Sequence, residues 1–202
     1  MLLDRLRLRP LAAGRTTIAA HWDNLFAHRD PYARLYVVLD RGGELELDGT
    51  PVHLRPGAAY LLPDGVPIRF GLARGMDHVW FHFRATLDAG VSLFAVRDLP
   101  VCIHQADGLL PVAHEALEIA ASLEDGHRPV PAAPGNLPEP DQLRFRLATR
   151  LRLLLEPFLT GARTRPHADE VARLAPVFHH VETHLHDDLR VSDLARIVNL
   201  HP

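Results

Sequence analysis

The 202-residue sequence contains no lysine, so all 22 of its basic residues are arginine. These arginines are scattered along the chain, and the formal net charge is −3. A protein that binds nucleic acid through bulk electrostatics needs concentrated positive charge, which this composition lacks. An arginine-only set suits phosphate or carboxylate recognition, but the scatter favours the alternative, an arginine- and alanine-rich genome.

Cysteine and long apolar runs are also scarce. Cys102 is the single cysteine, so an internal disulfide and a cysteine-based zinc site are excluded. Asp4 and Arg5 place charges where a signal peptide needs an apolar stretch. No run approaches the roughly 20 apolar residues of a membrane span. We therefore expect a soluble, cytoplasmic protein that has no membrane partner.

The composition that remains is that of a globular protein. Hydrophobic residues make up 47% of the chain, which is enough for a substantial core, and charged residues make up 23%. The length predicts one domain, or one domain with a fragment of another, at roughly 100–200 residues per domain.

Short strands separated by turns are predicted up to about residue 106. Apolar and β-branched segments alternate with glycine- and proline-containing turns, and Asp48-Gly49 is typical of a tight hairpin. The predicted strands cover residues 35–39, 44–48, 52–54, 59–62, 68–70 and 78–83. Their spacing of about ten residues is typical of a β-sandwich or a β-barrel. We predict a mainly β domain over residues 1–106.

Helical periodicity replaces this pattern in the second half of the chain. Helices are predicted over 109–123 and 142–159, separated by a proline-rich loop over 126–140. We assign residues 107–160 to a helical dimerisation segment and 161–169 to a linker. One helix ending near residue 185 and a second helix with Ser192 as its N-cap are predicted within residues 170–202.

Two sets of motifs in this order resemble the AraC/XylS family of bacterial transcription regulators. The first set is Arg-Gly-Gly at 41–43, Pro-Gly at 56–57, Pro-Asp-Gly at 63–65 and His-Val-Trp-Phe-His-Phe-Arg at 78–84. The second set is the helical segment 177–185 followed by 189–195, which contains Leu194-Ala195. The strand at 78–84 is similar to that of sugar-responsive, arabinose-regulator-like members.

The resemblance implies a cupin-like jelly-roll β-barrel that binds a small molecule, followed by helix-turn-helix units. In the family, a recognition helix follows the turn that here ends at His201-Pro202. We therefore expect DNA binding only through a C-terminal domain that is incomplete in this chain. From residue 170 onward there are five acidic residues and three arginines, which is not the charge pattern of a phosphate-binding surface.

The main alternative is a metal-dependent cupin enzyme, such as a sugar isomerase or a dioxygenase. Metal-binding cupins place a His-x-His pair and a glutamate on the early strands and a further histidine after the later turn. No histidine lies between Arg34 and Leu45, and Ile68 stands at the position of the later histidine. We therefore predict no metal, no cofactor and no catalytic residue, and we expect that the protein is not an enzyme.

The candidate ligand-binding residues centre on the strand at 78–83. His78, Trp80 and His82 alternate with apolar residues, so they share one face of a strand. An indole beside imidazoles suits a small polyol or sugar, although a core tryptophan with satisfied histidines gives the same pattern. Arg29 is predicted to supply a cation at the rim, and Leu6–Gly14 could act as an arm over the ligand. The full candidate set is His78, Trp80, His82, Arg29, Phe70 and Tyr36.

An apolar stripe marks one side of the helix predicted over 142–159. The resemblance implies that this helix forms the contact of a homodimer, and packing within one subunit is the alternative. The candidate dimerisation residues are Leu143, Leu147, Leu151, Leu154 and Phe158.

Overall fold

A computed structural model of the chain describes residues 5–23, 26–87, 90–125, 140–184, 186 and 188–199. These residues belong to two units. The sandwich unit consists of Leu8–Arg84 and Pro100–Gly161, and the terminal unit consists of Met1–Arg7, Ala85–Leu99 and Ala162–Pro202. The proline-rich loop predicted over 126–140 lies outside the described residues, apart from Pro140. The domain limits predicted from the sequence stay a prediction.

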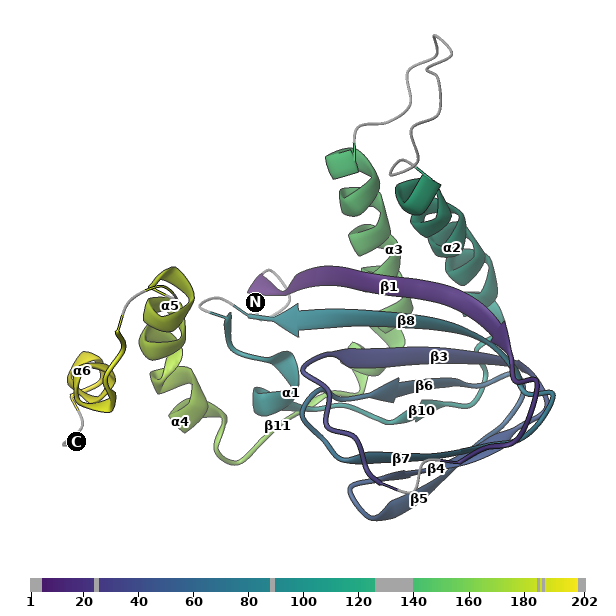
Figure 1. The fold of residues 1–202 in the computed structure, drawn as a ribbon, viewed down its shortest axis with the longest axis horizontal. Coiled ribbons are helices and arrows are strands. Elements are labelled where there is room, and N and C mark those ends of the chain that lie inside the picture. Colours follow the sequence, from purple (N-terminus) through teal and green to yellow (C-terminus); the bar gives the residue numbers. More distant parts are fainter. Residues whose placement is uncertain are drawn as a thin grey trace, which may run out of the picture. The chain divides into compact units, whose positions relative to one another are not determined.

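Two antiparallel sheets form the β portion of the sandwich unit (Figure 1). One sheet has the strand order β1-β8-β3-β6-β10, and the other has the order β2-β7-β4-β5. The strands are β1 (Arg7–Thr17), β2 (Trp22–Asp23), β3 (Ala33–Asp40), β4 (Gly43–Leu47), β5 (Thr50–Leu54), β6 (Ala59–Leu62), β7 (Ile68–Leu72), β8 (Asp77–Thr86) and β10 (Cys102–Ile103). All six strands predicted from the sequence are confirmed.

The prediction of a closed barrel is wrong for the described residues, because the strands form two separate sheets. Each sheet has one edge strand of only two residues, β10 in the first and β2 in the second, which leaves few backbone groups there for pairing with the other sheet. The described strands therefore form two facing sheets rather than a closed barrel.

Alternate residues of the two sheets meet in a shared core. Those of β3 and β6 include Tyr36, Val38, Tyr60 and Leu62, and they belong to the same buried cluster as residues of β4, β5 and β7. The side chains from the second sheet are Leu45, Leu47, Leu54, Ile68, Phe70 and Leu72. This alternation is the period of two that the sequence pattern predicts.

The hairpin between β4 and β5 shows why Asp48-Gly49 is a reliable turn signal. Asp48 has φ 49° and Gly49 has φ 78°, and a two-residue hairpin with positive φ at both central positions matches the right-handed twist of its strands. The predicted turn is confirmed.

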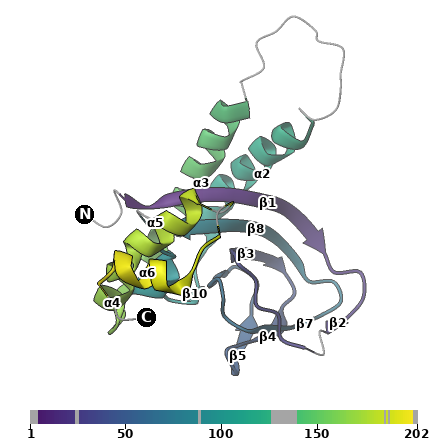
Figure 2. The same cartoon turned by 60° about the vertical axis from the view of Figure 1, so that its left-hand side comes forward.

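Two helices complete the sandwich unit. The short 3₁₀-helix η3 (Asp107–Leu109) leads into α2 (Leu110–Asp125), which packs along α3 (Pro140–Thr160), and α3 also contacts β10. Both views show α2 and α3 side by side, on the opposite side of the five-stranded sheet from β4, β5 and β7 (Figures 1 and 2). Both helices match the predictions of 109–123 and 142–159.

The terminal unit consists of short elements. They are α1 (Leu93–Val96), β9 (Arg97–Asp98), β11 (Arg163–Thr164), α4 (Ala168–Arg173), α5 (Ala175–Thr183) and α6 (Val191–Ile197). β9 and β11 pair antiparallel, and α4 contacts α1 and α5. None of the helices in the described part of the chain is both long and apolar enough to cross a membrane.

Two details of the predicted C-terminal helices are wrong. The single helix predicted to end near residue 185 is divided into α4 and α5, because Pro176 has no N–H to continue the hydrogen-bond ladder and instead occupies the first turn of α5. Ser192 is not the N-cap of α6. That helix begins at Val191 with Arg190 as its N-cap, so Ser192 lies within the first turn.

Candidate functional site

The candidate site lies on the face of β3 and β8 that is turned toward the four-stranded sheet. The register of β3 and β8 pairs Val38 with His78, Tyr36 with Trp80, and Arg34 with His82. Paired residues share a face of the sheet, so these side chains are neighbours. Phe70 joins them from β7, with its ring centroid 6.4 Å from that of Tyr36. The predicted shared face of the β8 residues is observed, and five of the six candidate residues lie together.

Arg34 is the buried cation of this site, and only 7% of it is exposed. Its Cζ lies 4.9 Å from the ring centroid of Tyr32 and 5.4 Å from that of Phe70, within cation–π range. Its Nη2 forms an ion pair with the carboxylate of Asp30 and donates to the Tyr32 hydroxyl at 3.4 Å. The guanidinium therefore has a carboxylate partner and lies within cation–π distance of two aromatic rings.

Two buried nitrogen atoms of the site have no hydrogen-bond partner within the described ranges. They are Nη1 of Arg34 and Nδ1 of His78, a residue that is 4% exposed. Leaving a buried polar atom unpaired costs about 1–3 kcal/mol, so such atoms call for an acceptor or a donor from elsewhere. The two residues belong to adjacent strands of one sheet, with Arg34 opposite His82 and His78 opposite Val38.

The two histidines of the site are neutral near pH 7. Burial lowers the pKa of His78, and burial together with the charge of Arg34 lowers the pKa of His82 to about 4. The His82 ring lies 4.7 Å from that of Trp80. Burial also raises the pKa of Tyr36 to about 12, so its phenol stays protonated. With Arg34 balanced by Asp30, the site has no net charge.

Acidification to about pH 4 is expected to destabilise the fold through His82. Its folded-state pKa of about 4 lies below the ordinary value of 6.5, so the unfolded chain binds the proton first and the free energy of unfolding decreases as the pH falls through this interval. Since His82 is partly exposed, we expect a loss of about 1–2 kcal/mol. Urea unfolding at several pH values measures it. His82→Phe should lose less stability than the wild type, and identical pH profiles would contradict this prediction.

The indole of Trp80 is held by β1, the strand that contains most of the predicted arm. Trp80 Nε1 donates to the Thr16 hydroxyl at 2.9 Å. Gly14 lies directly against the indole, because a Cβ at this position would approach Trp80 Cζ2 to 2.6 Å. The segment predicted as an arm over the ligand is thus a sheet strand that neighbours β8.

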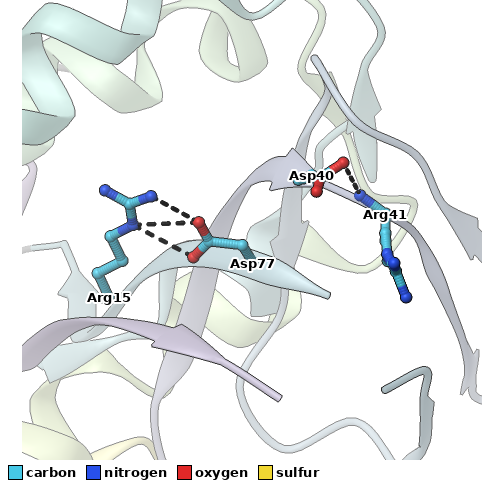
Figure 3. A network of polar contacts seen from close by, with 4 residues as sticks. All are labelled: Arg15, Asp40, Arg41 and Asp77. Carbon is cyan, nitrogen blue, oxygen red and sulfur yellow. Dashed lines mark hydrogen bonds and ion pairs between the residues drawn. The ribbon is translucent and has the colours of Figure 1, made fainter. Parts of the chain in front are cut away.

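An ion pair at the end of β8 reinforces this placement of β1 (Figure 3). Arg15 Nε donates to both carboxylate oxygens of Asp77 at 3.2 Å, and its Nη2 donates to Oδ2 at 2.6 Å. The hydrogen bond from Arg15 is the main reason why the pKa of Asp77 is lowered. Close by, Asp40 accepts a hydrogen bond from the backbone N–H of Arg41. The Arg15–Asp77 ion pair holds β1 beside β8.

The predicted rim cation, Arg29, is not the cation buried in this site. Arg29 is exposed, and its Nη1 donates to the carbonyl of Gly65 at 3.2 Å. Arg34 supplies the buried guanidinium instead. The alternation of side chains along a strand could have found Arg34, because it places Arg34 on the same face as Tyr36. The strand predicted from the sequence began one residue too late, at Leu35, whereas β3 begins at Ala33. Asp30 and Tyr32, which hold Arg34, had no signal of their own.

The apolar stripe of α3 is buried within the single chain. The exposed fractions of its five candidate dimerisation residues are between 0% and 8%. Packing within one subunit, the alternative left open by the sequence, accounts for Leu143, Leu147, Leu151, Leu154 and Phe158. The exposed apolar side chains of α3 are Phe145 and Leu153, at 74% and 43%. A dimer contact through α3 would have to use this outer face.

No group of three or more histidine, cysteine or acidic side chains in the described residues is arranged to hold a metal ion. No family profile and no curated protein sequence matches the chain. Solved structures do resemble it in part. An RmlC-like cupin protein from Desulfovibrio desulfuricans is 19% identical, with 39% of this chain and 82% of that chain covered and a TM-score of 0.30.

Two further solved structures have similar TM-scores. A cupin protein from Bacteroides fragilis is 13% identical over 41% of this chain and 65% of its own, with a TM-score of 0.28. The salicylate 1,2-dioxygenase from Pseudaminobacter salicylatoxidans is 12% identical over 43% of this chain and 31% of its own, with a TM-score of 0.30. The coarse likeness is to cupin proteins.

Proposed function

We propose that the chain is the ligand-sensing and dimerisation portion of an AraC-family transcription regulator. One observation carries the ligand-sensing role. Nη1 of Arg34 and Nδ1 of His78 are buried and have no hydrogen-bond partner among the described residues, and the partly exposed indole of Trp80 belongs to the same face of the sheet. A bound molecule that offers an acceptor oxygen to Arg34 and a flat or apolar face to Trp80 would satisfy the guanidinium and cover the indole.

The charge balance of the site supports an uncharged ligand. Asp30 already compensates Arg34, and His78 and His82 are neutral near pH 7. A buried anion would therefore lack a compensating cation, which is costly in a site of low polarity. Hydroxyl and carbonyl oxygens are the acceptors that fit, so a small polyhydroxy compound such as a sugar is our leading candidate. No catalytic step is part of the proposal.

The regulatory part of the proposal rests on the motif order in the sequence and on the helices α5 and α6, which contact each other. Binding of the ligand beside β1 would bias the position of this strand, and an intact regulator would present its DNA-binding domains differently as a result. Homodimerisation belongs to the same proposal, with the outer face of α3 around Phe145 and Leu153 as its surface.

A ligand screen with two tryptophan variants tests the site. Thermal-shift measurements on sugars, sugar acids and small aromatic compounds identify binders, because binding to the folded state raises the melting temperature. A binder is expected to change the tryptophan fluorescence of the wild type and of Trp22→Phe, but not of Trp80→Phe. Arg34→Met is expected to weaken its binding about 10-fold or more.

The outcome that would overturn the assignment is equally specific. If a confirmed binder changes the fluorescence of Trp80→Phe as it does that of the wild type, or binds Arg34→Met with unchanged affinity, the ligand site lies elsewhere. The sequence contains two tryptophans, so Trp22→Phe leaves Trp80 as the sole reporter.

A further inference from the structure

A second polar site lies in the terminal unit, where β9 and β11 pair and the chain leads into α4. There the surface has a hollow of about 460 Å³, within the range typical of small-molecule sites. Its walls include Asp98 of β9, Arg163 and Thr164 of β11, and the following Arg165 and His167. The site shares no residue with the Arg34–Trp80 site.

The cations of this hollow are only partly compensated. Asp98 is the single acidic residue in its wall, and its Oδ1 lies 3.8 Å from Arg165 Nη2, at the long end of an ion pair. Arg165 Nε donates to the carbonyl of Arg97 at 3.3 Å, which fixes the guanidinium beside the hollow. The side chain of Arg163 is exposed and has no ion-pair or hydrogen-bond partner among the described residues, while its backbone lies opposite that of Asp98 in the pairing of β9 and β11. One guanidinium is thus free and a second is weakly paired.

The wall of the hollow also includes Thr164, which carries a hydroxyl. The Thr164 hydroxyl accepts a hydrogen bond from Arg97 Nη1, which leaves its own hydrogen available to donate. Guanidinium groups match the oxygen atoms of a phosphate in a planar, two-pronged geometry, and charge-assisted bonds of this kind are stronger than neutral ones. The guanidinium groups of Arg163 and Arg165, both in the wall of the hollow, therefore offer donors suited to several oxygens of one tetrahedral oxyanion.

We propose that this hollow binds the phosphate group of a small molecule. A concave site favours such a ligand over duplex DNA, whose phosphates are contacted from an open, strongly basic surface. The proposal is independent of the function proposed above, since neither site needs the other to be occupied.

Titration of the full chain tests the proposal. Inorganic phosphate and ribose 5-phosphate are added separately at constant ionic strength, with sodium chloride as the reference, and the arginine Nε–Hε signals are followed by NMR. We expect saturable shifts with both phosphates, and Arg163→Gln should weaken the affinity about tenfold. Because Arg163 is exposed and unpaired among the described residues, this variant should fold as the wild type does, which circular dichroism checks.

Arg173→Gln is the matched control. Arg173 is an exposed arginine in the last turn of α4, outside the hollow, so its replacement should leave the affinity within about twofold. Shifts no larger than those with chloride would overturn the proposal. Equal weakening in Arg163→Gln and Arg173→Gln would also overturn it, because it would mean general electrostatic attraction. So would saturable binding of a short DNA duplex in the absence of any response to the small phosphates.

Discussion

Leu151→Asp is expected to unfold the protein rather than to yield a folded monomer. Leu151 is 1% exposed in the middle of α3, with Leu154 and Leu155 fully buried next to it. Removing a buried leucine side chain costs about 2–5 kcal/mol, and a carboxylate without a partner adds several more. Domains are stable by about 5–15 kcal/mol, so we expect a loss of at least about 5 kcal/mol in urea unfolding followed by circular dichroism.

Leu153→Asp is the control on the same helix. Leu153 is 43% exposed, so the same change should alter the free energy of unfolding by less than about 1 kcal/mol. Light scattering on this variant then tests the outer face of α3 as a dimer contact without unfolding the chain. Wild-type stability of Leu151→Asp would show that the stripe is not buried in the subunit.

Asp30→Ala is expected to cost about 2–4 kcal/mol, more than the removal of its partner by Arg34→Met. The asymmetry follows from burial. The side chain of Arg34 is 8% exposed, whereas that of Asp30 is 24% exposed. Removing Asp30 leaves a buried guanidinium without a counter-charge. Removing Arg34 leaves a carboxylate that water can reach, and the methionine side chain still packs between Tyr32 and Phe70.

A double-mutant cycle measured by urea unfolding checks this expectation. The double variant Asp30→Ala/Arg34→Met should be more stable than Asp30→Ala alone, because the unpaired buried charge is gone. If the double variant loses, relative to the wild type, the sum of the free energies of unfolding that the two single variants lose, the proposed coupling is contradicted. It would also mean that Arg34 is not the organising charge of the site.

The strand pattern was predictable because its causes are local. Alternation of apolar and polar residues and the positive φ required at Asp48 and Gly49 are written in neighbouring residues, and they placed all six predicted strands and the hairpin. The same local rule put His78, Trp80 and His82 on one face. A sequence pattern predicts the existence of a strand better than its ends. The predicted strand began at Leu35, so Arg34 was not recognised as a residue of β3.

Contacts between distant segments were not predictable in this way. The sequence shows an apolar stripe on α3 but not what covers it, and the structure shows that it is buried within the chain. Arg29 and Arg34 look alike in the sequence, and only the facing sheet, with Phe70, decides which guanidinium is buried. The separation of the strands into two sheets is likewise decided by pairing between segments that are distant in the sequence.

By itself, the sequence determined that this chain contains a β domain of short strands followed by two amphipathic helices, because side-chain periodicity is a property of each segment alone. It also determined that the net charge is close to neutral and that cysteine chemistry is limited to one thiol. Tertiary structure alone decided which polar groups are buried without partners, because burial depends on residues far apart in the chain. Two features could be found only in the tertiary structure. They are the buried polar atoms of Arg34 and His78 and the hollow lined by Arg163 and Arg165.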